Sequence, residues 1–330
     1  MSILITPDCN AARNETNDIF LSSAFRRIIA GEFKLTAVQV QLQHNTNQYY
    51  FPAFIQSNLF GKKTLILGAG FDKTGAIPVF SSEDYQDSIE LLLKALANTY
   101  ISTLEIRTTQ RIPCLQDDSD KVEPNIDMPN GAAAVWENLS KKTRSNIRRT
   151  LKHGFSAEMG TSADLLDTFY ALYQRNIQQL GSLPHPKTFF AQILKQCPEQ
   201  SLIFIGYMEN KPVVAAFNLV NTTEIYFAWA GRDPDYRQHD PFLTMLWKMV
   251  EYCEQNGKKT YNLGRSSFES NPYTFKMKLA NRVNKIYYYQ LNIPRQSAPS
   301  RLRKAVSWLI QRSPTIVMNG FSRALIHKFY

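Results

Sequence analysis

The chain has 330 residues, of which 44% are hydrophobic and 12% aromatic, and its 38 Lys and Arg against 28 Asp and Glu give a net charge of +10. This length and composition predict two globular domains and exclude a largely disordered chain. The four cysteines have no metal-binding spacing, no signal peptide is indicated, and no apolar run reaches the roughly 18 residues that span a bilayer. We therefore expect a cytoplasmic protein without a bound metal or a permanent cofactor.

The front half of the chain has the pattern of a mixed α+β domain. Its predicted elements, in chain order, are a helix over 17–30, strands over 35–42, 48–56 and 64–68, a helix over 82–98 and a strand over 102–108. The segment 110–133 is rich in Asp, Pro, Asn and Gly and is predicted to be a linker. The expected divisions are therefore 1–133, 134–294 and a tail over 295–330.

The back half repeats this order of elements. Its predicted elements are helices over 163–180 and 187–196, strands over 202–208, 212–218 and 224–230, a helix over 241–256, a strand over 260–263, a short helix over 271–279 and a β-rich run over 284–291. Three meandering strands, a crossover helix and a parallel strand are similar to the GNAT fold of acyltransferases. We expect tandem GNAT-like domains with mixed, mainly antiparallel sheets flanked by helices.

Positive charge is concentrated in the back half. Residues 1–138 hold 11 Lys and Arg against 16 Asp and Glu, whereas no acid follows Glu269 and eleven Lys or Arg do. This asymmetry indicates a phosphate-bearing partner for the back half, such as a nucleotide-linked donor, a tRNA, a lipid diphosphate or a membrane surface. The oligomeric state is not indicated by any pattern.

Six of these cations fall within residues 141–152, a predicted helix with Ser140 as its N-cap and Gly154 at its end. Lys142 lies in the first turn, and Arg144, Arg148 and Lys152 follow at four-residue spacing on one face. Like charges on one face repel each other, so the stripe is either solvated or lies against an anion. The pattern alone leaves both interpretations open.

Three motifs in the back half occur in a fixed order. They are Trp136-x-x-Leu139-x-x-Lys142-x-Arg144-x-x-Ile147-Arg148, then Asn262-Leu263-Gly264-Arg265-Ser266, then Phe275-Lys276. Their order and separation resemble the FemAB-like, BioF2-like branch of GNAT-fold acyltransferases, in particular the subgroup associated with exopolysaccharide and exosortase (PEP-CTERM) systems. The block Leu180-Gly-Ser-Leu-Pro-His185 is similar to that subgroup as well.

The resemblance implies transfer of an acyl or aminoacyl group to an amine. It implies that Lys276 faces the substrate cleft, where it can stabilise an oxyanion or a diphosphate. The chain departs from the subgroup at Asn262-Leu263, where relatives have Asp-Phe, and after Lys276, where Met277 replaces a Trp-Gly-like continuation. If that Asp is a catalytic base in relatives, Asn262 cannot replace it.

The stretch 232–242 corresponds to the pyrophosphate-binding loop of acetyl-CoA-dependent GNAT enzymes. It has no glycine pair, and Asp240 with Pro241 stands where backbone N–H groups would hold a phosphate. We therefore expect acetyl-CoA to bind weakly. The donor remains open between an acyl-CoA and an aminoacyl-tRNA, because characterised FemAB-like proteins take aminoacyl groups from tRNA.

The remaining candidates each have a structural alternative. Arg265 offers a bidentate fork for phosphate, or an ion pair with an acid near 233–240. His185 lies in a Pro-bracketed loop and is either a general base or a hydrogen-bonding loop residue. Lys276 is either catalytic or a solvated lysine. Tyr236 is a candidate for substrate binding and for protonation of a leaving group, and Asn262 for substrate binding.

The tail carries six cations and no acid from 297 to 330. Its apolar positions predict two basic amphipathic helices, which either lie on an anionic membrane surface through 300–329 or cap the back domain. The expected function is that of an N-acyltransferase or aminoacyltransferase for an amino sugar or a lipid-linked glycan precursor in envelope or exopolysaccharide synthesis. The alternative is a non-catalytic protein that binds a glycan-lipid or nucleic acid through a basic cleft.

Overall fold

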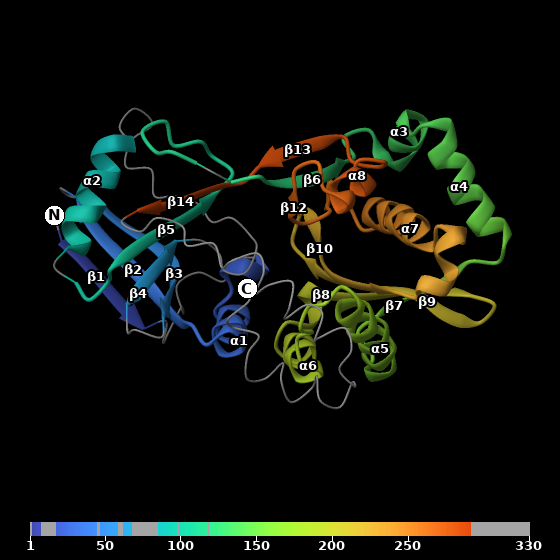
Figure 1. The fold of residues 1–330 in the computed structure, drawn as a ribbon, viewed down its shortest axis with the longest axis horizontal. Coiled ribbons are helices and arrows are strands. Elements are labelled where there is room, and N and C mark those ends of the chain that lie inside the picture. Colours follow the sequence, from blue (N-terminus) through green and yellow to red (C-terminus); the bar gives the residue numbers. More distant parts are fainter. Residues whose placement is uncertain are drawn as a thin grey trace. The chain divides into compact units, whose positions relative to one another are not determined.

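The computed structural model describes residues 2–7, 18–44, 47–58, 62–67, 85–97, 99–117 and 119–291. These residues form two compact units, each with its own sheet (Figure 1). Unit 1 contains residues up to Lys121 together with 285–296, and unit 2 is built around 122–284. The division at 121 and 122 precedes the expected one at 133, and the chain returns to unit 1 after Asn284.

Unit 1 is a six-stranded sheet with helices. Its elements are β1 (Ser2–Pro7), η1 (Ile19–Leu21), α1 (Ser23–Phe33), β2 (Thr36–His44), β3 (Asn47–Ser57), β4 (Lys63–Leu67), α2 (Tyr85–Leu96), β5 (Thr103–Thr108) and β14 (Tyr287–Leu291). Strands β1 to β4 form an antiparallel meander, and β5 returns parallel to β4 after α2. The predicted meander and crossover of the front half are thereby confirmed.

The α2 helix forms because its apolar residues recur on one side. Ile89, Leu92 and Leu96 are buried at helical spacing and join the same apolar cluster as the inward residues of β2 to β5. The inward residues of the strands alternate with more exposed ones, as in Val38 and Val40 of β2. This match of period and burial explains why the sequence predicted these elements correctly.

Strand β14 was expected in the back domain but belongs to the sheet of unit 1. It pairs antiparallel with β5, with Tyr289 opposite Ile106. The Tyr289 ring is buried, and its hydroxyl accepts a hydrogen bond from the Ile112 N–H at 2.8 Å. The β-rich character of 284–291 was recognised, but a sequence pattern does not reveal a partner strand so far away in the chain.

Unit 2 contains an eight-stranded sheet with helices on both faces. Its elements are β6 (Lys121–Asp127), α3 (Gly131–Asn138), α4 (Lys141–Lys152), β7 (Ser156–Gly160), α5 (Ala163–Gln179), α6 (Lys187–Gln196), η2 (Pro198–Gln200), β8 (Ser201–Met208), β9 (Lys211–Val220), β10 (Glu224–Arg232), η3 (Pro234–His239), α7 (Pro241–Gln255), β11 (Thr260–Asn262), β12 (Ser266–Ser267), α8 (Asn271–Lys276) and β13 (Arg282–Lys285). The strand order is β12-β6-β11-β10-β9-β8-β7, and β13 also pairs with β6.

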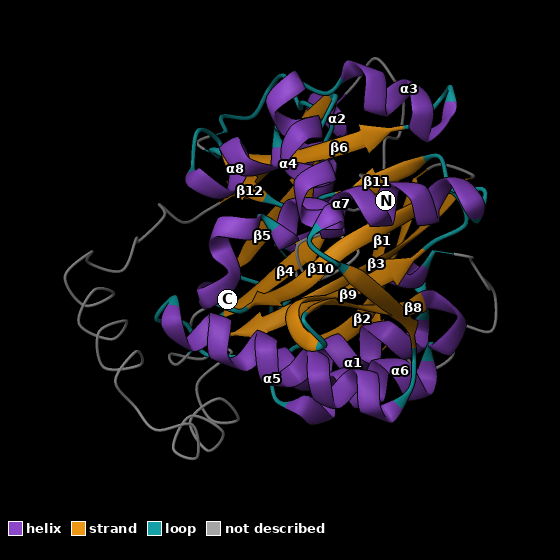
Figure 2. Ribbon diagram, turned by 90° about the vertical axis from the view of Figure 1, so that its right-hand side faces the viewer, coloured by secondary structure: helices purple, strands orange, loops and turns teal. Residues whose placement is uncertain are grey.

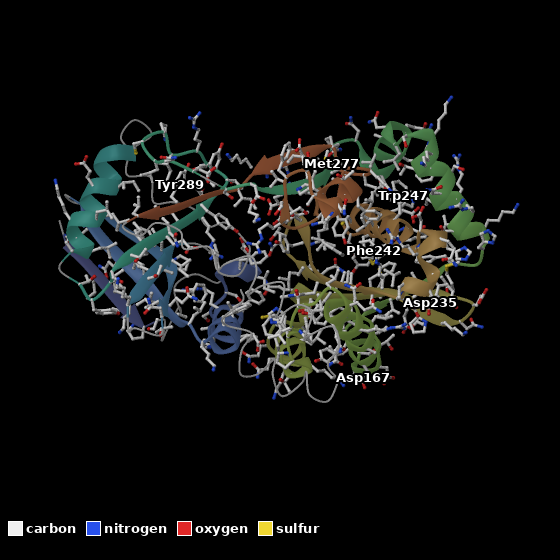
Figure 3. All side chains as sticks on the ribbon, in the orientation of Figure 1. Asp167, Asp235, Phe242, Trp247, Met277 and Tyr289 are labelled. Carbon is white, nitrogen blue, oxygen red and sulfur yellow. The ribbon has the colours of Figure 1, made fainter. Side chains whose placement is uncertain are left out.

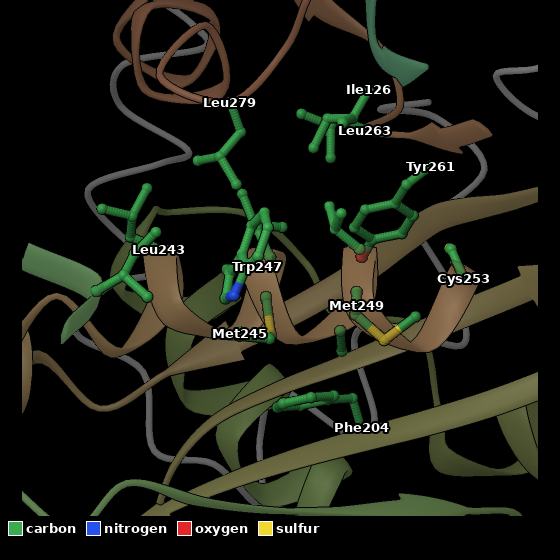
Figure 4. Close-up of a cluster of buried hydrophobic side chains, with 14 of the residues drawn as sticks. Ile126, Phe204, Leu243, Met245, Trp247, Met249, Cys253, Tyr261, Leu263 and Leu279 are labelled. Carbon is green, nitrogen blue, oxygen red and sulfur yellow. The ribbon is translucent and has the colours of Figure 1, made fainter. Parts of the chain in front are cut away.

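Two apolar layers enclose this sheet. On one side, the buried face of α7 packs with residues of β8, β10 and β11, as the close-up of Trp247, Met249, Phe204 and Tyr261 shows (Figure 4). On the other side, α5 and α6 supply aromatic rings that contact Phe217 of β9 and Trp229 of β10. Figure 2 shows α5 and α6 on the opposite side of strands β8 to β10 from α7.

Strand β6 lies in the segment that was predicted to be a linker. It pairs antiparallel with β11, and its residues 122–126 are buried. The proline and the polar residues of this segment argued against a strand. Pro124 fits because its carbonyl oxygen accepts the Leu263 N–H at 2.9 Å. The Asn125 amide is buried as well, and it donates to the Glu123 carbonyl.

Asp127 at the end of β6 joins three segments of unit 2. Its carboxylate accepts hydrogen bonds from Arg282 at 2.5 and 3.0 Å and from the Thr260 hydroxyl at 2.9 Å. The Arg282 hydrogen bond holds the pKa of Asp127 below its usual value, against the opposing effect of burial. The carboxylate therefore favours the folded state when it is ionised.

We expect Asp127→Asn to lower the free energy of unfolding at neutral pH by about 1 kcal/mol, because one charge-assisted pair is lost. A depressed folded-state pKa contributes stability above the unfolded pKa, and that contribution disappears as pH falls through the folded pKa. Urea unfolding of both proteins should therefore show a difference at neutral pH that begins to shrink near the ordinary pKa of Asp, 3.8, and is gone once the pH is below the lower folded-state pKa. An equal difference at both pH values would contradict a role for the ionised carboxylate.

Within the described ranges, no helix is both long and apolar enough to cross a membrane. The predicted tail over 295–330 lies outside the described residues.

Candidate active site

The central feature of unit 2 is a notch between two parallel strands. Strand β10 pairs with β11 only over Glu224, Ile225 and Tyr226, although β10 continues to Arg232. Its register with β9 shifts between Phe227 and Trp229, just where the pairing with β11 ends. A bulge bends a strand and changes its twist, and the ladder between β10 and β11 does not continue beyond Tyr226. The open edge between parallel strands is where α/β proteins commonly place ligands.

One wall of the notch is aromatic. The ring of Phe242, at the start of α7, lies between Phe227 of β10 at 5.9 Å and Phe275 of α8 at 5.5 Å, and both contacts are edge-to-face. Phe242 is labelled beside α7 in Figure 3. All three rings are partly buried, so they pack on the core and still present apolar surface.

A tight turn after β11 forms the other side. The buried Asn262 side chain accepts the Gly264 N–H at 2.9 Å. Gly264 has a φ of +70°, and a Cβ atom there would lie 2.7 Å from the Phe227 carbonyl oxygen. The turn therefore requires glycine for two reasons, its left-handed backbone and its close approach to β10.

Lys276 ties this turn to α8. Its ammonium donates to the Gly264 and Arg265 carbonyl oxygens at 3.1 and 3.2 Å and to the Ser266 hydroxyl at 2.9 Å. An ammonium has three donors, so it can make these three contacts at the same time. The predicted proximity of the second and third motifs is thus present, and Lys276 is half-buried rather than a solvated lysine. Arg265 is half-buried in the same turn.

Asn262 has a structural role in this turn. Its side-chain oxygen accepts the Gly264 N–H, and a carboxylate at this position could accept the same N–H. The change from the Asp of relatives therefore preserves the acceptor that shapes the turn. With 1% of its surface exposed, Asn262 does not offer its side chain to a substrate, contrary to the expected binding role.

The three acidic residues of the loop between β10 and α7 each contact a side chain of a neighbouring helix. Arg175 of α5 pairs with Asp233 at 3.4 Å and approaches Asp235 at 3.9 Å. The Asp240 carboxylate accepts the Asn146 amide of α4 at 2.7 Å. Asp240 has a φ of 49°, and its side chain does not cap α7. The three acids considered as ion-pair partners of Arg265 thus contact Arg175 and Asn146.

Two arginines in this region, Arg232 and Arg237, form no ion pair with the acidic residues that the structure describes. Arg232, at the end of β10, is half-buried, and its pKa is lowered by burial and by the nearby charge of Arg237. Gly231 faces α5, so Arg232 emerges on the α7 side. Two uncompensated arginines there favour an anion.

The first motif forms a corner between α3 and α4. Arg144 donates to the Glu137 carbonyl at 3.1 Å and to the Glu137 carboxylate at 2.9 Å. The Arg148 guanidinium lies 5.2 Å from the centre of the Trp136 ring, which packs on Trp247 at 4.7 Å. Both arginines thus contact α3, whereas the sequence left open whether their face of the helix is solvated or lies against an anion. Lys142 is exposed in the first turn of α4.

His185 is not placed to act as a general base. Only 1% of its surface is exposed, and its ring packs on Phe189 at 4.8 Å and on Trp229 at 6.0 Å. These rings belong to the α5 and α6 side of the sheet, opposite α7. The Pro-bracketed loop is therefore an aromatic packing element, and the loop pattern could not reveal this because burial depends on the tertiary fold.

The structure also places groups that the sequence did not single out. Arg232 and Phe242 contribute to the notch and its surroundings. A signal for Arg232 was its position at the end of a strand, before a loop with no glycine. Tyr236 of η3 is half-buried, and its ring centre lies 6.4 Å from that of His239.

In the described ranges, no three His, Cys, Asp or Glu residues gather as a metal site. Burial raises the pKa of the Cys253 thiol to about 12, so it is no nucleophile at neutral pH.

The comparisons with known proteins agree with this geometry. Residues 141–277 match the family described as the acetyltransferase (GNAT) domain. The fold is similar to the crystal structure of FemX, with a TM-score of 0.65 and 12% identity over 93% of this chain and 100% of that one. No curated protein matches the chain in sequence.

Two further structures share the fold. One is the C-terminal domain of a protein described as a lysylphosphatidylglycerol synthetase from Agrobacterium fabrum, with a TM-score of 0.54 and 14% identity over 87% of this chain and 95% of that one. The other is a tandem GNAT protein from the clavulanic acid biosynthesis pathway, with a TM-score of 0.53 and 10% identity over 89% of this chain and 100% of that one. Residues 141–277 thus match a GNAT acetyltransferase domain, and the fold of the chain is similar to that of FemX and of a tandem GNAT protein.

Proposed function

We propose that this protein transfers an acyl or aminoacyl group from a phosphate-bearing donor to the amine of an amino sugar or a lipid-linked glycan precursor. The observation that carries the proposal is the half-buried Arg232 at the end of β10, with the exposed Arg237 of η3 close enough to lower its pKa, in the segment that leads to the N-terminal end of α7. A cation that is half-buried without an acidic partner is costly unless an anion completes the site. A donor phosphate fits this requirement.

The reaction needs little covalent chemistry from the protein. The amine nitrogen attacks the acyl carbonyl carbon, a C–N bond forms, and the bond to the donor oxygen or sulfur breaks. One amine proton must leave, and the departing alkoxide or thiolate takes up a proton. Positioning of the two substrates supplies much of the rate enhancement, and Tyr236 is the candidate proton donor. The aromatic wall and the Lys276-bound turn would hold the acyl group between them.

The name of one structural neighbour supports an aminoacyl donor, because a lysylphosphatidylglycerol synthetase makes an aminoacylated lipid. The loop after β10 supports the same choice, since 232–242 contains no glycine and Pro241 has no N–H at the first position of α7. The Asp240 carboxylate keeps its negative charge and is oriented by the Asn146 amide, which opposes a pyrophosphate at the start of α7. We place the protein at the cytoplasmic side of the envelope on the basis of its motif resemblance and charge.

The test is mass spectrometry of purified protein incubated with an amino-sugar acceptor and either acetyl-CoA or aminoacyl-tRNA. We expect aminoacylated product with the tRNA donor and weak acetyl-CoA binding by calorimetry. Arg232→Ala should raise the donor KM roughly tenfold, as loss of a charge-assisted contact does. The exposed Lys195 of α6, changed to Ala, is the matched control. Tight stoichiometric acetyl-CoA binding would instead identify an ordinary acetyltransferase.

A further inference from the structure

Unit 2 has a second concavity on a different side of α8. It is a pocket of about 440 Å³ between the α3–α4 corner and the turn that follows α8. Its polar lining comes from Asn138, Ser140 and Thr143 on one side and Thr274, Lys278 and Asn281 on the other. Thr274 and Lys278 are spaced four residues apart and face the pocket, whereas Phe275 contacts Phe242 and Lys276 binds the Gly264 turn.

The walls of this pocket are fixed by local contacts. The Ser140 hydroxyl accepts the Thr143 N–H at 3.1 Å and lies 2.9 Å from the Thr143 hydroxyl. The Asn281 side chain bonds the backbone N–H and carbonyl of Asp127, each at 2.8 Å. The Lys278 ammonium lies 4.9 Å from the Phe275 ring centre, at the surface. Both sides of the pocket are therefore held in place before a ligand enters.

The chemistry of the lining selects a class of ligand. No Asp or Glu lines the pocket, Lys278 does, and the exposed Lys141 and Lys142 follow Ser140 in the chain. Positive charge without a compensating acid favours an anion, and hydroxyl and amide groups match a ligand with several hydroxyls. Val135, Leu139 and Met277 form an apolar part of the lining that can cover the carbon skeleton of such a ligand.

We propose that this pocket binds a phosphorylated polyol. Its phosphate pairs with Lys278, and its hydroxyls bond to the hydroxyl and amide groups of Asn138, Ser140 and Thr274. The same chemistry occurs in a soluble sugar phosphate and in the glycerophosphate headgroup of a lipid. The pocket lining contains none of the residues assigned to the notch, and its contact with the notch wall is the Lys278 ammonium against the Phe275 ring.

The experiment compares two sources of this chemistry. Soluble glucose 1-phosphate and glycerol 3-phosphate are titrated into the full-length protein by calorimetry, and phosphatidylglycerol vesicles are tested by flotation against phosphatidylcholine vesicles. Hydrogen exchange with bound probe should slow in 138–143 and 274–281. Binding of glucose 1-phosphate without phosphatidylglycerol vesicles assigns a sugar phosphate. Binding of glycerol 3-phosphate together with phosphatidylglycerol vesicles, or of these vesicles alone, with the same variant effects, assigns a lipid headgroup.

Two variants and one control test whether the probe binds in this pocket. Lys278→Ala should weaken binding roughly tenfold, because a charge-assisted contact is lost. Thr274→Trp, at an exposed position, should fill the pocket and abolish binding without altering the melting temperature. Lys195→Ala, on α6, should bind like the wild type. No binding of any probe at millimolar concentration, or binding that neither variant changes, would overturn the proposal, whether or not transfer activity is found.

Discussion

Lys276→Ala is expected to lower the transfer rate about a hundredfold while the protein stays folded. Removing a group that stabilises or positions a reacting centre typically costs roughly 3 kcal/mol of transition-state stabilisation. In this protein the ammonium makes three hydrogen bonds to the turn 264–266, which faces the notch. Alanine would leave two carbonyl oxygens and one hydroxyl without their donor. The measurement is the steady-state rate with the donor and acceptor identified by mass spectrometry.

The same kinetics distinguish two roles for Lys276. If the ammonium moves to stabilise an oxyanion, kcat should fall and the donor KM should stay constant. If it acts by holding the turn, the donor KM should rise as well, and Ser266→Ala should reproduce part of that change because it removes one of the three contacts. Lys195→Ala is the control for loss of a lysine charge. An unchanged rate in Lys276→Ala would exclude both roles.

The fold was largely predictable because its main elements carry strong local patterns. The buried residues of α2 recur at helical spacing, and those of β2 alternate, so pattern and structure agree. The N-caps follow the same rule. Ser140 and Ser162 both accept N–H bonds at the starts of α4 and α5. The order of these elements was enough to identify the tandem arrangement.

Long-range pairings were not predictable in the same way. Strand β6 contains a proline and buried polar residues, and it is a strand because β11 lies beside it. Strand β14 has a clear β pattern, yet nothing within it points to β5, which lies far earlier in the chain. In both cases the local sequence describes the segment, and the partner strand decides the domain to which it belongs.

The candidate site shows the same distinction between residue type and partner. The spacing of Arg144 and Arg148 correctly placed both on one helix, but Glu137 and Trp136 of α3 are their contacts. Likewise, Asp240 was expected to repel a phosphate, and the Asn146 amide orients its carboxylate. A charge read from a sequence has no known partner, so its availability follows only from the fold.

Gly264→Ala is expected to damage both stability and activity through a single added methyl group at the notch. The new Cβ would lie 2.7 Å from the Phe227 carbonyl oxygen, in a residue with a φ of +70°. Left-handed strain and a backbone clash together should lower the free energy of unfolding by roughly 2–5 kcal/mol. Because the clash would push the Gly264 turn away from β10, transfer activity should fall even at temperatures where the variant is folded.

Gly154→Ala separates these two causes. Gly154 has a φ of +80°, but a Cβ atom there would meet nothing within 4 Å. It should therefore show the left-handed strain alone, about 1 kcal/mol, with normal transfer kinetics. Chemical unfolding of both variants, followed by rate measurements on the folded proteins, gives the comparison. Equal destabilisation of the two variants would mean that Gly264 can move away from Phe227 at little cost, and the turn would then not be a rigid wall of the notch.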